Sequence, residues 1–225
     1  MRTVMLTGAA GNLGRAVASA FAEAGDNLVL LDLKAGALPS NDRQFYIAAN
    51  LLETQSVQSA VEQAMQRFKR IDVLCNIAGG FRMGSPVHET SEKDWNFLLD
   101  INARTLLNMS RAVVPVMLKA GGGKIVNIGA FAAQKGAAQM GGYIASKSAV
   151  IRLTETMAAE LREKNINVNC VLPTIIDTPE NRAAMPKADP KRWVAPQDLA
   201  KVIVFLASDA ARAIHGAALP VTGLS

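Results

Sequence analysis

The stretch that decides the fold is Thr7–Gly14, which reads T-G-A-A-G-N-L-G. It directly follows an apolar segment, Thr3–Leu6, and it opens an amphipathic pattern, Leu13–Ala24, so it predicts a strand–turn–helix unit. Its three glycines permit a tight turn and a close approach of the backbone to a diphosphate, and the helix N-terminus supplies free N–H groups. The residues expected to line a nucleotide here are Gly8, Gly11, Asn12, Leu13 and Gly14.

Short apolar segments alternate with longer amphipathic ones along the rest of the chain. Most of the apolar segments are continuous, which is typical of parallel strands covered on both faces. The alternation predicts an α/β fold with a Rossmann-type, doubly wound parallel sheet of about seven strands and helices on both faces. The expected strands are Thr3–Leu6, Asn27–Asp32, Gln44–Ala48, Ile71–Asn76, Lys124–Ile128, Asn167–Val171 and Ala218–Val221, and the expected helices are Leu13–Ala24, Thr54–Lys69, Ala103–Leu118, Tyr143–Glu163 and Gln197–Ala207.

One segment, residues 173–196, interrupts this alternation. It contains five prolines and follows the carboxyl end of an expected strand. Such a segment is a candidate substrate loop, since ligands of open α/β sheets bind outside the carboxyl ends of the strands. We find no repeat, low-complexity tract or linker, so we expect residues 1–225 to form a single domain.

Composition excludes several classes of function. The chain is 50% hydrophobic and 19% charged, which argues against disorder, and the Lys and Arg residues behind its net charge of +5 are scattered, which argues against a nucleic-acid partner. We see no signal peptide and no apolar stretch of the ~18 residues that a membrane span needs. Cys75 and Cys170 lie in apolar strands, which favours a reducing, cytoplasmic setting. His88 and His215 are too far apart in sequence to suggest a metal site.

Asp32 ends the second expected strand, eighteen residues after Gly14. An acidic residue at this place accepts hydrogen bonds from the ribose hydroxyls of NAD and repels the 2′-phosphate of NADP. The positive charge of Lys34, two residues after Asp32, would weaken this preference for NAD over NADP. We therefore expect NAD as the cofactor and NADP as the less favoured one, with a simple loop or capping role for Asp32 as the alternative.

The pattern Tyr143-Ile144-Ala145-Ser146-Lys147 places a phenol and an ammonium one turn apart on one helix face. A phenol with a pKa near ~10 is a poor acid or base at neutral pH. A neighbouring ammonium, together with the charge of a bound nicotinamide, favours the phenolate and lowers that pKa, so Tyr143 can exchange a proton with a carbonyl or alcohol oxygen. Tyr143 and Lys147 are therefore the candidate catalytic pair.

Together with the glycine-rich turn, this Y-x-A-S-K pattern resembles that of the short-chain dehydrogenase/reductase family, and the resemblance covers essentially the whole chain. It implies hydride transfer between a nicotinamide and a small substrate. It further implies that Asn102 supports a proton relay to Lys147 through its backbone. It also implies a homodimer or homotetramer built on the helices Ala103–Leu118 and Tyr143–Glu163. The remaining cofactor contacts that it implies come from Asn50, Leu51, Asn76, Ala78, Gly79, Pro173 and Thr178.

Among the departures from the family pattern, which include Cys75, Asn50 and Thr174, two matter most. Asn12 stands where the family has its middle glycine, and asparagine tolerates a left-handed backbone better than most residues. Ala130 stands where the family has its catalytic serine, thirteen residues before Tyr143. Loss of one such donor typically costs roughly 10²–10³ in rate. Gln134 and Thr174 are the candidates to replace the missing hydroxyl.

The same alanine occurs in one branch of the family, the dihydropteridine reductases, which the chain resembles in three places. These are Ile128–Ala130, Ala78–Phe81 and a block from Val171 to Trp193. In this comparison Phe81 would stack on a flat substrate. Reduction of a conjugated ring makes a serine donor less necessary, because the charge need not collect on one oxygen.

Three functions follow from these patterns. The first is an NAD(H)-dependent oxidoreductase acting on a small carbonyl or alcohol, or on a conjugated C=N bond. The second is a dihydropteridine reductase-like activity. The third is a non-catalytic NAD(H)-binding sensor, which Ala130 favours and the intact pair of Tyr143 and Lys147 disfavours. The residues expected at the substrate are Phe81, Ala130 and Gln134.

Overall fold

The structure is a computed structural model that describes residues 1–34 and 40–225. Within these residues, seven strands form one sheet in the order β3-β2-β1-β4-β5-β6-β7, and every neighbouring pair is parallel. The predicted Rossmann-type, doubly wound sheet is confirmed. The strands are β1 (Thr3–Thr7), β2 (Asn27–Asp32), β3 (Gln44–Ala48), β4 (Val73–Asn76), β5 (Gly123–Ile128), β6 (Ile166–Pro173) and β7 (Ala218–Val221).

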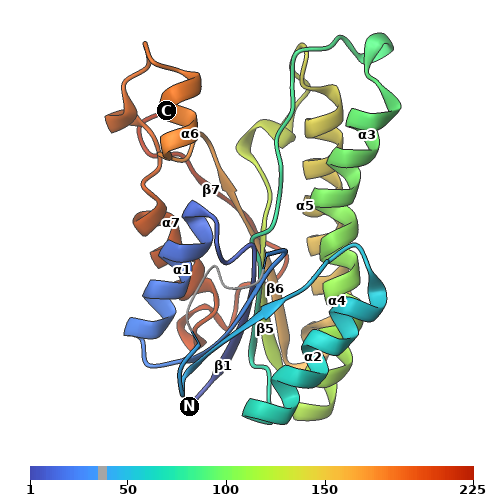
Figure 1. Cartoon of the computed structure of the whole chain (residues 1–225), viewed down its shortest axis with the longest axis vertical. Coiled ribbons are helices and arrows are strands. Elements are labelled where there is room, and N and C mark those ends of the chain that lie inside the picture. The colour runs from blue at the N-terminus through green and yellow to red at the C-terminus, as the bar shows by residue number, and fades with distance from the viewer. Residues whose placement is uncertain (35–39) are drawn as a thin grey trace.

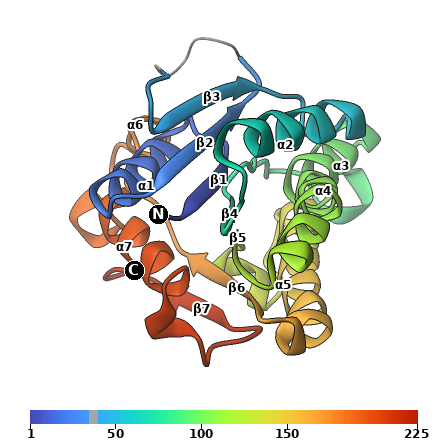
Figure 2. The ribbon, with the colours of Figure 1, turned by 90° about the horizontal axis from the view of Figure 1, so that it is seen from below.

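Helices cover both faces of this sheet, as Figures 1 and 2 show. The apolar side chains of α1 and α7 pack on one face, and those of α2, α4 and α5 pack on the other. No helix within residues 1–34 and 40–225 combines the length and the apolarity that crossing a membrane requires. The helices are α1 (Asn12–Glu23), α2 (Thr54–Phe68), α3 (Glu92–Leu99), α4 (Thr105–Ala120), α5 (Gly141–Leu161), α6 (Pro179–Ala184) and α7 (Pro196–Leu206).

The order of the strands reverses between β1 and β4. The chain runs from β1 outward through β2 to β3, and it then returns to the other side of β1 and runs outward again through β4, β5, β6 and β7. A ligand of such a sheet binds in the crevice at this reversal, beyond the carboxyl ends of the strands. The segments that follow β1, β2, β4, β5 and β6 are therefore brought to one edge.

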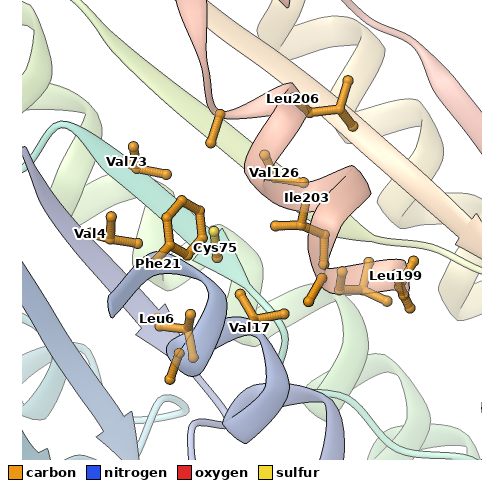
Figure 3. Close-up of a cluster of buried hydrophobic side chains, with 14 of the residues drawn as sticks. Val4, Leu6, Val17, Phe21, Val73, Cys75, Val126, Leu199, Ile203 and Leu206 are labelled. Carbon is orange, nitrogen blue, oxygen red and sulfur yellow. The ribbon is translucent and has the colours of Figure 1, made fainter. Parts of the chain in front are cut away.

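The core behind this edge is built where α1 and α7 meet the sheet (Figure 3). Val17 and Phe21 lie one turn apart on α1, and Leu199, Ile203 and Leu206 repeat at helical spacing on α7, so each helix presents one apolar stripe. All five are fully or almost fully buried. They pack against strand residues that include Val4, Leu6, Val73, Cys75 and Val126.

β1 and β5 are each one residue longer than predicted, and β4 and β6 differ from the prediction by two or more residues. β4 begins at Val73 rather than Ile71, because Asp72 precedes the ladder and its carboxylate accepts a hydrogen bond from the Thr3 N–H at 2.8 Å. Ile71 is nevertheless completely buried, and this is why its pattern reads as part of a strand. β6 extends to Pro173, because β7 continues to pair with it up to Pro173 and Val221.

One expected helix, Ala103–Leu118, is wrong at its start. The structure has α3, then a π-helical turn at Asp100–Arg104, and only then α4. The sequence analysis missed α3, although Ser91 caps it by accepting a hydrogen bond from the Asp94 N–H. A π turn inside a helix is often found at a functional site.

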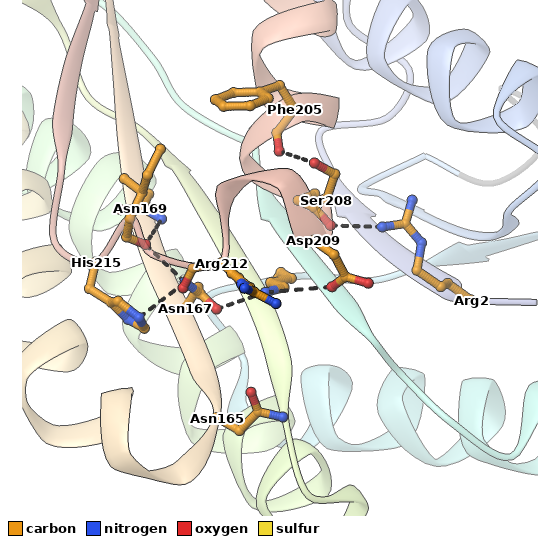
Figure 4. Close-up of polar contacts among 12 residues, drawn as sticks. Arg2, Asn165, Asn167, Asn169, Phe205, Ser208, Asp209, Arg212 and His215 are labelled. Atoms are coloured by element: carbon orange, nitrogen blue, oxygen red, sulfur yellow. Dashed lines mark hydrogen bonds and ion pairs between the residues drawn. The ribbon is translucent and has the colours of Figure 1, made fainter.

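Two asparagines of β6 fix the chain before β7, as Figure 4 shows. The Asn169 side chain donates to the Ile214 carbonyl at 2.8 Å and accepts from the Ala217 N–H at 3.0 Å. The Asn167 Nδ2 donates to the carbonyls of Arg212 and Ile214, both at 2.9 Å. The two amides therefore satisfy backbone groups that would otherwise be orphaned beside the sheet.

Substitution of Asn169 by Ala is expected to lower the free energy of unfolding by about 1–3 kcal/mol, because it leaves the Ala217 N–H without its acceptor and removes one of the two hydrogen bonds that the Ile214 carbonyl accepts. Urea unfolding followed by circular dichroism measures the effect. Gln63→Ala on the exposed face of α2 is the matched control, with an expected change within about 0.5 kcal/mol. Equal losses in the two variants would contradict the structural role of Asn169.

Candidate active site

A cavity of about 1270 Å³ opens at the carboxyl edge of the sheet. The segments after β1, β2, β3, β4, β5 and β6 line it, together with the start of α5. The structure thus brings together most of the residues that the sequence singles out. They are Gly8, Gly11, Asn12, Leu13, Gly14, Asp32, Asn50, Leu51, Ala78, Gly79, Phe81, Ala130, Tyr143, Lys147, Pro173 and Thr178.

The turn between β1 and α1 is too tight for side chains at two of its glycines. Gly8 has a φ of +64°, and a Cβ there would lie 2.9 Å from the Ala78 backbone. A Cβ on Gly14 would lie 2.1 Å from the Gly8 carbonyl oxygen, a distance that no real contact allows. Gly11 is less constrained, because a Cβ added there would lie 3.4 Å from the same oxygen. The turn leaves an open cradle at the N-terminus of α1, which fits a dinucleotide diphosphate.

A threonine that the sequence analysis did not single out holds this turn against the neighbouring strand. The Thr7 Oγ1 accepts hydrogen bonds from the N–H groups of Ile77 and Ala78, at 3.0 and 3.1 Å. The side chain is buried. Its position directly before the first glycine was the available signal. The segment after β4 is thereby fixed beside the glycine-rich turn.

Asp32 both lines the cavity and supports the turn. One carboxylate oxygen accepts from the Ala10 N–H at 2.9 Å, and the other accepts from the Leu33 N–H at 2.8 Å. Each oxygen keeps a second acceptor position that can receive a ribose hydroxyl. The loop role and the cofactor role expected for Asp32 are therefore compatible.

The left-handed backbone suggested for Asn12 is wrong. Within the described residues, the only non-glycine positions with positive φ are Lys69, Gln139 and Asn165. Asn12 is instead the first residue of α1, and its Nδ2 donates to the Glu180 carboxylate of α6 at 2.8 Å. The side chain in place of the family's glycine therefore connects the cofactor cradle to the segment after β6.

Tyr143 and Lys147 lie in the first two turns of α5, and both line the cavity. The buried Lys147 Nζ donates to the Ile128 carbonyl at 2.8 Å. Burial lowers the pKa of Lys147 to about 8 and raises the pKa of Tyr143 to about 12. The lowered phenol pKa expected from the sequence is thus absent in the chain by itself. It would require the charge of the bound cofactor in addition to the lysine.

The lowered lysine pKa predicts a pH dependence of stability. The pKa of Lys147 falls from 10.5 to about 8 on folding, so the unfolded chain binds more protons between these values. The free energy of unfolding then gains a contribution as pH rises from 8 towards 10. We expect wild type to gain stability over Lys147→Met between pH 7.5 and pH 9.5 in urea unfolding. Parallel pH profiles for the two proteins would contradict a depressed lysine pKa.

Asn102 lies in the π-helical turn and does not line the cavity. Its Nδ2 donates to the Gly80 carbonyl and to the Ser146 Oγ, both at 3.0 Å, and its Oδ1 accepts from the Gly80 N–H. Ser146, another residue not singled out from the sequence, donates to the Tyr143 carbonyl at 2.8 Å. Asn102 therefore ties the loop after β4 to the helix that carries Tyr143 and Lys147. Its predicted backbone relay stays a prediction.

Two further expected site residues lie outside the cavity lining. The Asn76 side chain donates sideways to Asn127 of β5, so it joins two strands. The exposed Gln134 donates to the Phe131 carbonyl at 3.4 Å. The predicted ligand contacts of Asn76 and Gln134, and the replacement of the missing serine by Gln134, stay predictions. Thr174 does line the cavity, but its hydroxyl is within 2.9 Å of the Thr222 carbonyl.

The wall opposite the catalytic helix comes from the loop after β4. The Phe81 ring meets the Tyr143 ring edge to face, with 4.7 Å between centroids. The buried methyl group of Ala130 lines the cavity where the family has its serine hydroxyl. Three methionines that the sequence analysis did not single out also line it: Met83, Met140 and Met185. Their dispersed positions gave no signal, because three different loops bring them together.

The fold and this cavity define a nicotinamide-dependent oxidoreductase, and comparison with known proteins specifies the family. A family model described as enoyl-(acyl carrier protein) reductase matches residues 8–223. The chain therefore belongs to the short-chain dehydrogenase/reductase family, and it is an enzyme of that type.

Relatives and a solved structure that match almost the whole chain support this assignment. The chain is 36% identical to D-threitol dehydrogenase of Mycolicibacterium smegmatis over 239 aligned residues, covering 99% of this chain and 92% of the relative. It is 31% identical to dehydrogenase/reductase SDR family member 6 of Rattus norvegicus, covering 99% and 96%. Among solved structures, NAD⁺-bound xylitol dehydrogenase superposes with a TM-score of 0.90 at 28% identity, covering 99% of this chain and 98% of that one.

Proposed function

We propose that this enzyme transfers hydride between NAD(H) and a small carbonyl or alcohol, or a conjugated C=N bond, with Tyr143 as the acid/base. The observation that carries the proposal is the cavity itself, which joins the glycine-rich cradle, Asp32, Tyr143 and Lys147 in one continuous space. The NAD⁺ bound to the similar xylitol dehydrogenase supports the choice of cofactor. We also propose that residues 173–196 form the substrate loop of a single domain in the cytoplasm.

When bound, NADH would supply the hydride. The chain's own residues then have separable roles. The N–H groups at the start of α1 bind the diphosphate, and Asp32 accepts from the ribose hydroxyls. Tyr143 gives its hydroxyl proton to the substrate oxygen during reduction and takes one during oxidation. Lys147 supplies the positive charge that stabilises the phenolate.

Asp32 supports a preference for NADH over NADPH, and Asp32→Asn tests it. The amide keeps an acceptor for the Ala10 N–H but loses the charge that repels a 2′-phosphate. We expect the ratio of kcat/KM for NADH to that for NADPH to fall at least roughly tenfold, since juxtaposed like charges cost several kcal/mol. Steady-state kinetics with both cofactors measures the ratio. An unchanged ratio would mean that Asp32 supports the turn and does not determine the cofactor preference.

Ala130 favours a second candidate, a dihydropteridine reductase-like activity. The absence of a hydroxyl at this position suits a substrate whose charge spreads over a conjugated ring. The exposed Phe81 ring supports it as a wall for a flat molecule. Rapid NADH oxidation with quinonoid dihydropterin, and little with ketones, would establish this candidate. The reverse result would exclude it.

We propose a homodimer or homotetramer built on α4 and α5. On α4, Leu107 and Leu118 are exposed, and these are side chains that an interface would cover. Light scattering after size-exclusion chromatography measures the assembly, and a monomeric mass would reject the proposal.

A further inference from the structure

The substrate end of the cavity is apolar. We define the apolar chamber as Phe81, Met83, Phe131, Met140, Ile176 and Met185, which come from the segments after β4, β5 and β6 and from the residue before α5. Phe81 lies against Tyr143, so the chamber adjoins the proposed proton donor. Phe81 and Met83 are 55% and 56% exposed, although both are large apolar side chains. A bound molecule would remove this apolar surface from water.

None of the residues that define the apolar chamber carries a charged side chain. Among the described residues, only Asp32 and Lys147 line the cavity with charged side chains, and these have roles at the cofactor and beside Tyr143. Arg82, which lies between Phe81 and Met83 in the sequence, points away from the cavity. Its guanidinium lies 3.7 Å from the centre of the Phe97 ring and is paired with Asp94. The site therefore offers no counter-ion to an anionic substrate.

The polar side chains of the chamber region each make at least one hydrogen bond within the protein. The Thr178 Oγ1 accepts from the Asn181 N–H at 3.2 Å, and the Asn181 Nδ2 donates to the Ile176 carbonyl at 2.8 Å. The Thr174 hydroxyl bonds to the segment after β7. Ala130 contributes a methyl group. The hydroxyl of Tyr143 makes no hydrogen bond within the part of the chain that the structure describes, so both its proton and its oxygen can meet a substrate oxygen.

From this arrangement we infer that the substrate is an uncharged, mostly apolar cyclic ketone or secondary alcohol whose single oxygen meets Tyr143. The inference rests on the proposed function and narrows it. Methionine and phenylalanine side chains adapt to a ring and make favourable sulfur–aromatic and apolar contacts with it. A polyol or the polar edge of a pterin would leave hydroxyl and amide groups without partners, which disfavours both.

Matched ring ketones test the inference on the full chain with NADH. Cyclohexanone and 4-hydroxycyclohexanone differ by one hydroxyl, and an apolar pocket discriminates such a pair by up to about 10²-fold in kcat/KM. We expect cyclohexanone to exceed its hydroxylated analogue by about 10- to 100-fold. Both ketones should exceed dihydroxyacetone and quinonoid dihydropterin. A preference for any of the polar substrates would overturn the substrate class but leave the proposed oxidoreductase function intact.

A variant of the chamber tests whether its apolar side chains cause the preference for cyclohexanone over 4-hydroxycyclohexanone. Met83→Gln keeps the side-chain length and adds an amide, so we expect the cyclohexanone to 4-hydroxycyclohexanone ratio to fall several-fold. Val87→Gln, in the same loop but outside the cavity lining, should keep the wild-type ratio. A ratio that Met83→Gln leaves unchanged would contradict the chamber. Absence of turnover with every substrate, in wild type as in Tyr143→Phe, would reject the proposed function and the inference together.

Discussion

Replacement of Tyr143 by Phe is expected to lower kcat by about 10²–10⁴-fold, the usual contribution of a positioned acid or base. The substitution removes one oxygen and keeps the ring, so its edge-to-face contact with Phe81 persists. The dissociation constant for NADH should therefore stay within about twofold of wild type. Stopped-flow kinetics and fluorescence titration measure the two quantities.

The chain offers a matched control, because Tyr46 is its only other tyrosine. The Tyr46 hydroxyl donates to the Lys34 carbonyl, and the side chain does not line the cavity. Tyr46→Phe should keep kcat near the wild-type value. If the two variants lose activity equally, Tyr143 has no specific role in proton transfer.

Replacement of Gly14 by Ala is the second large effect that we expect. The new methyl group would lie 2.1 Å from the Gly8 carbonyl oxygen and 2.8 Å from the Ala9 Cα. Because all of these atoms are backbone, the turn itself must shift. We expect NADH affinity to fall by at least about 100-fold, a loss of roughly 2.7 kcal/mol of binding free energy.

Gly11→Ala is the control for this second prediction. Its added methyl group meets the Gly8 carbonyl oxygen only at 3.4 Å, and Gly11 has an ordinary φ of −72°. The free energy of unfolding of Gly11→Ala should stay within about 1 kcal/mol of wild type, while Gly14→Ala loses more. Chemical unfolding separates a loss of the fold from a loss of the cradle. Equal stability and equal NADH affinity for Gly14→Ala and wild type would contradict the geometry of the turn.

Sequence patterns were informative where burial or chain geometry leaves a local signature. β2, β3 and β7 match their predicted bounds, because each reads as a short apolar run closed by turn residues. The cradle was predictable, since local geometry requires two of its glycines: Gly8 has a positive φ, and a side chain on Gly14 would meet the Gly8 and Ala9 backbone. Tyr143 and Lys147 were predictable because one helix turn fixes their spacing.

Contacts between distant segments left no such signature. The hydrogen bond from Asn76 to Asn127 follows from the register of β4 with β5, which pairs residues 51 positions apart. The role of Asn12 depends on Glu180, 168 residues away. The apolar chamber is likewise assembled from separate loops, so its methionines show no common spacing in the sequence. The raised phenol pKa follows from burial, which the Y-x-A-S-K spacing does not encode.

The central claim is hydride transfer from NADH to a substrate carbon in this cavity. The most direct measurement uses two preparations of NADH, one deuterated at the pro-R and the other at the pro-S hydrogen of C4. Cyclohexanone is the acceptor. Mass spectrometry of the alcohol should find one deuterium on the carbinol carbon from only one of the two NADH preparations, and none with Tyr143→Phe over the same time. Deuterium-free alcohol from both preparations, or equal product from the variant, would contradict the account.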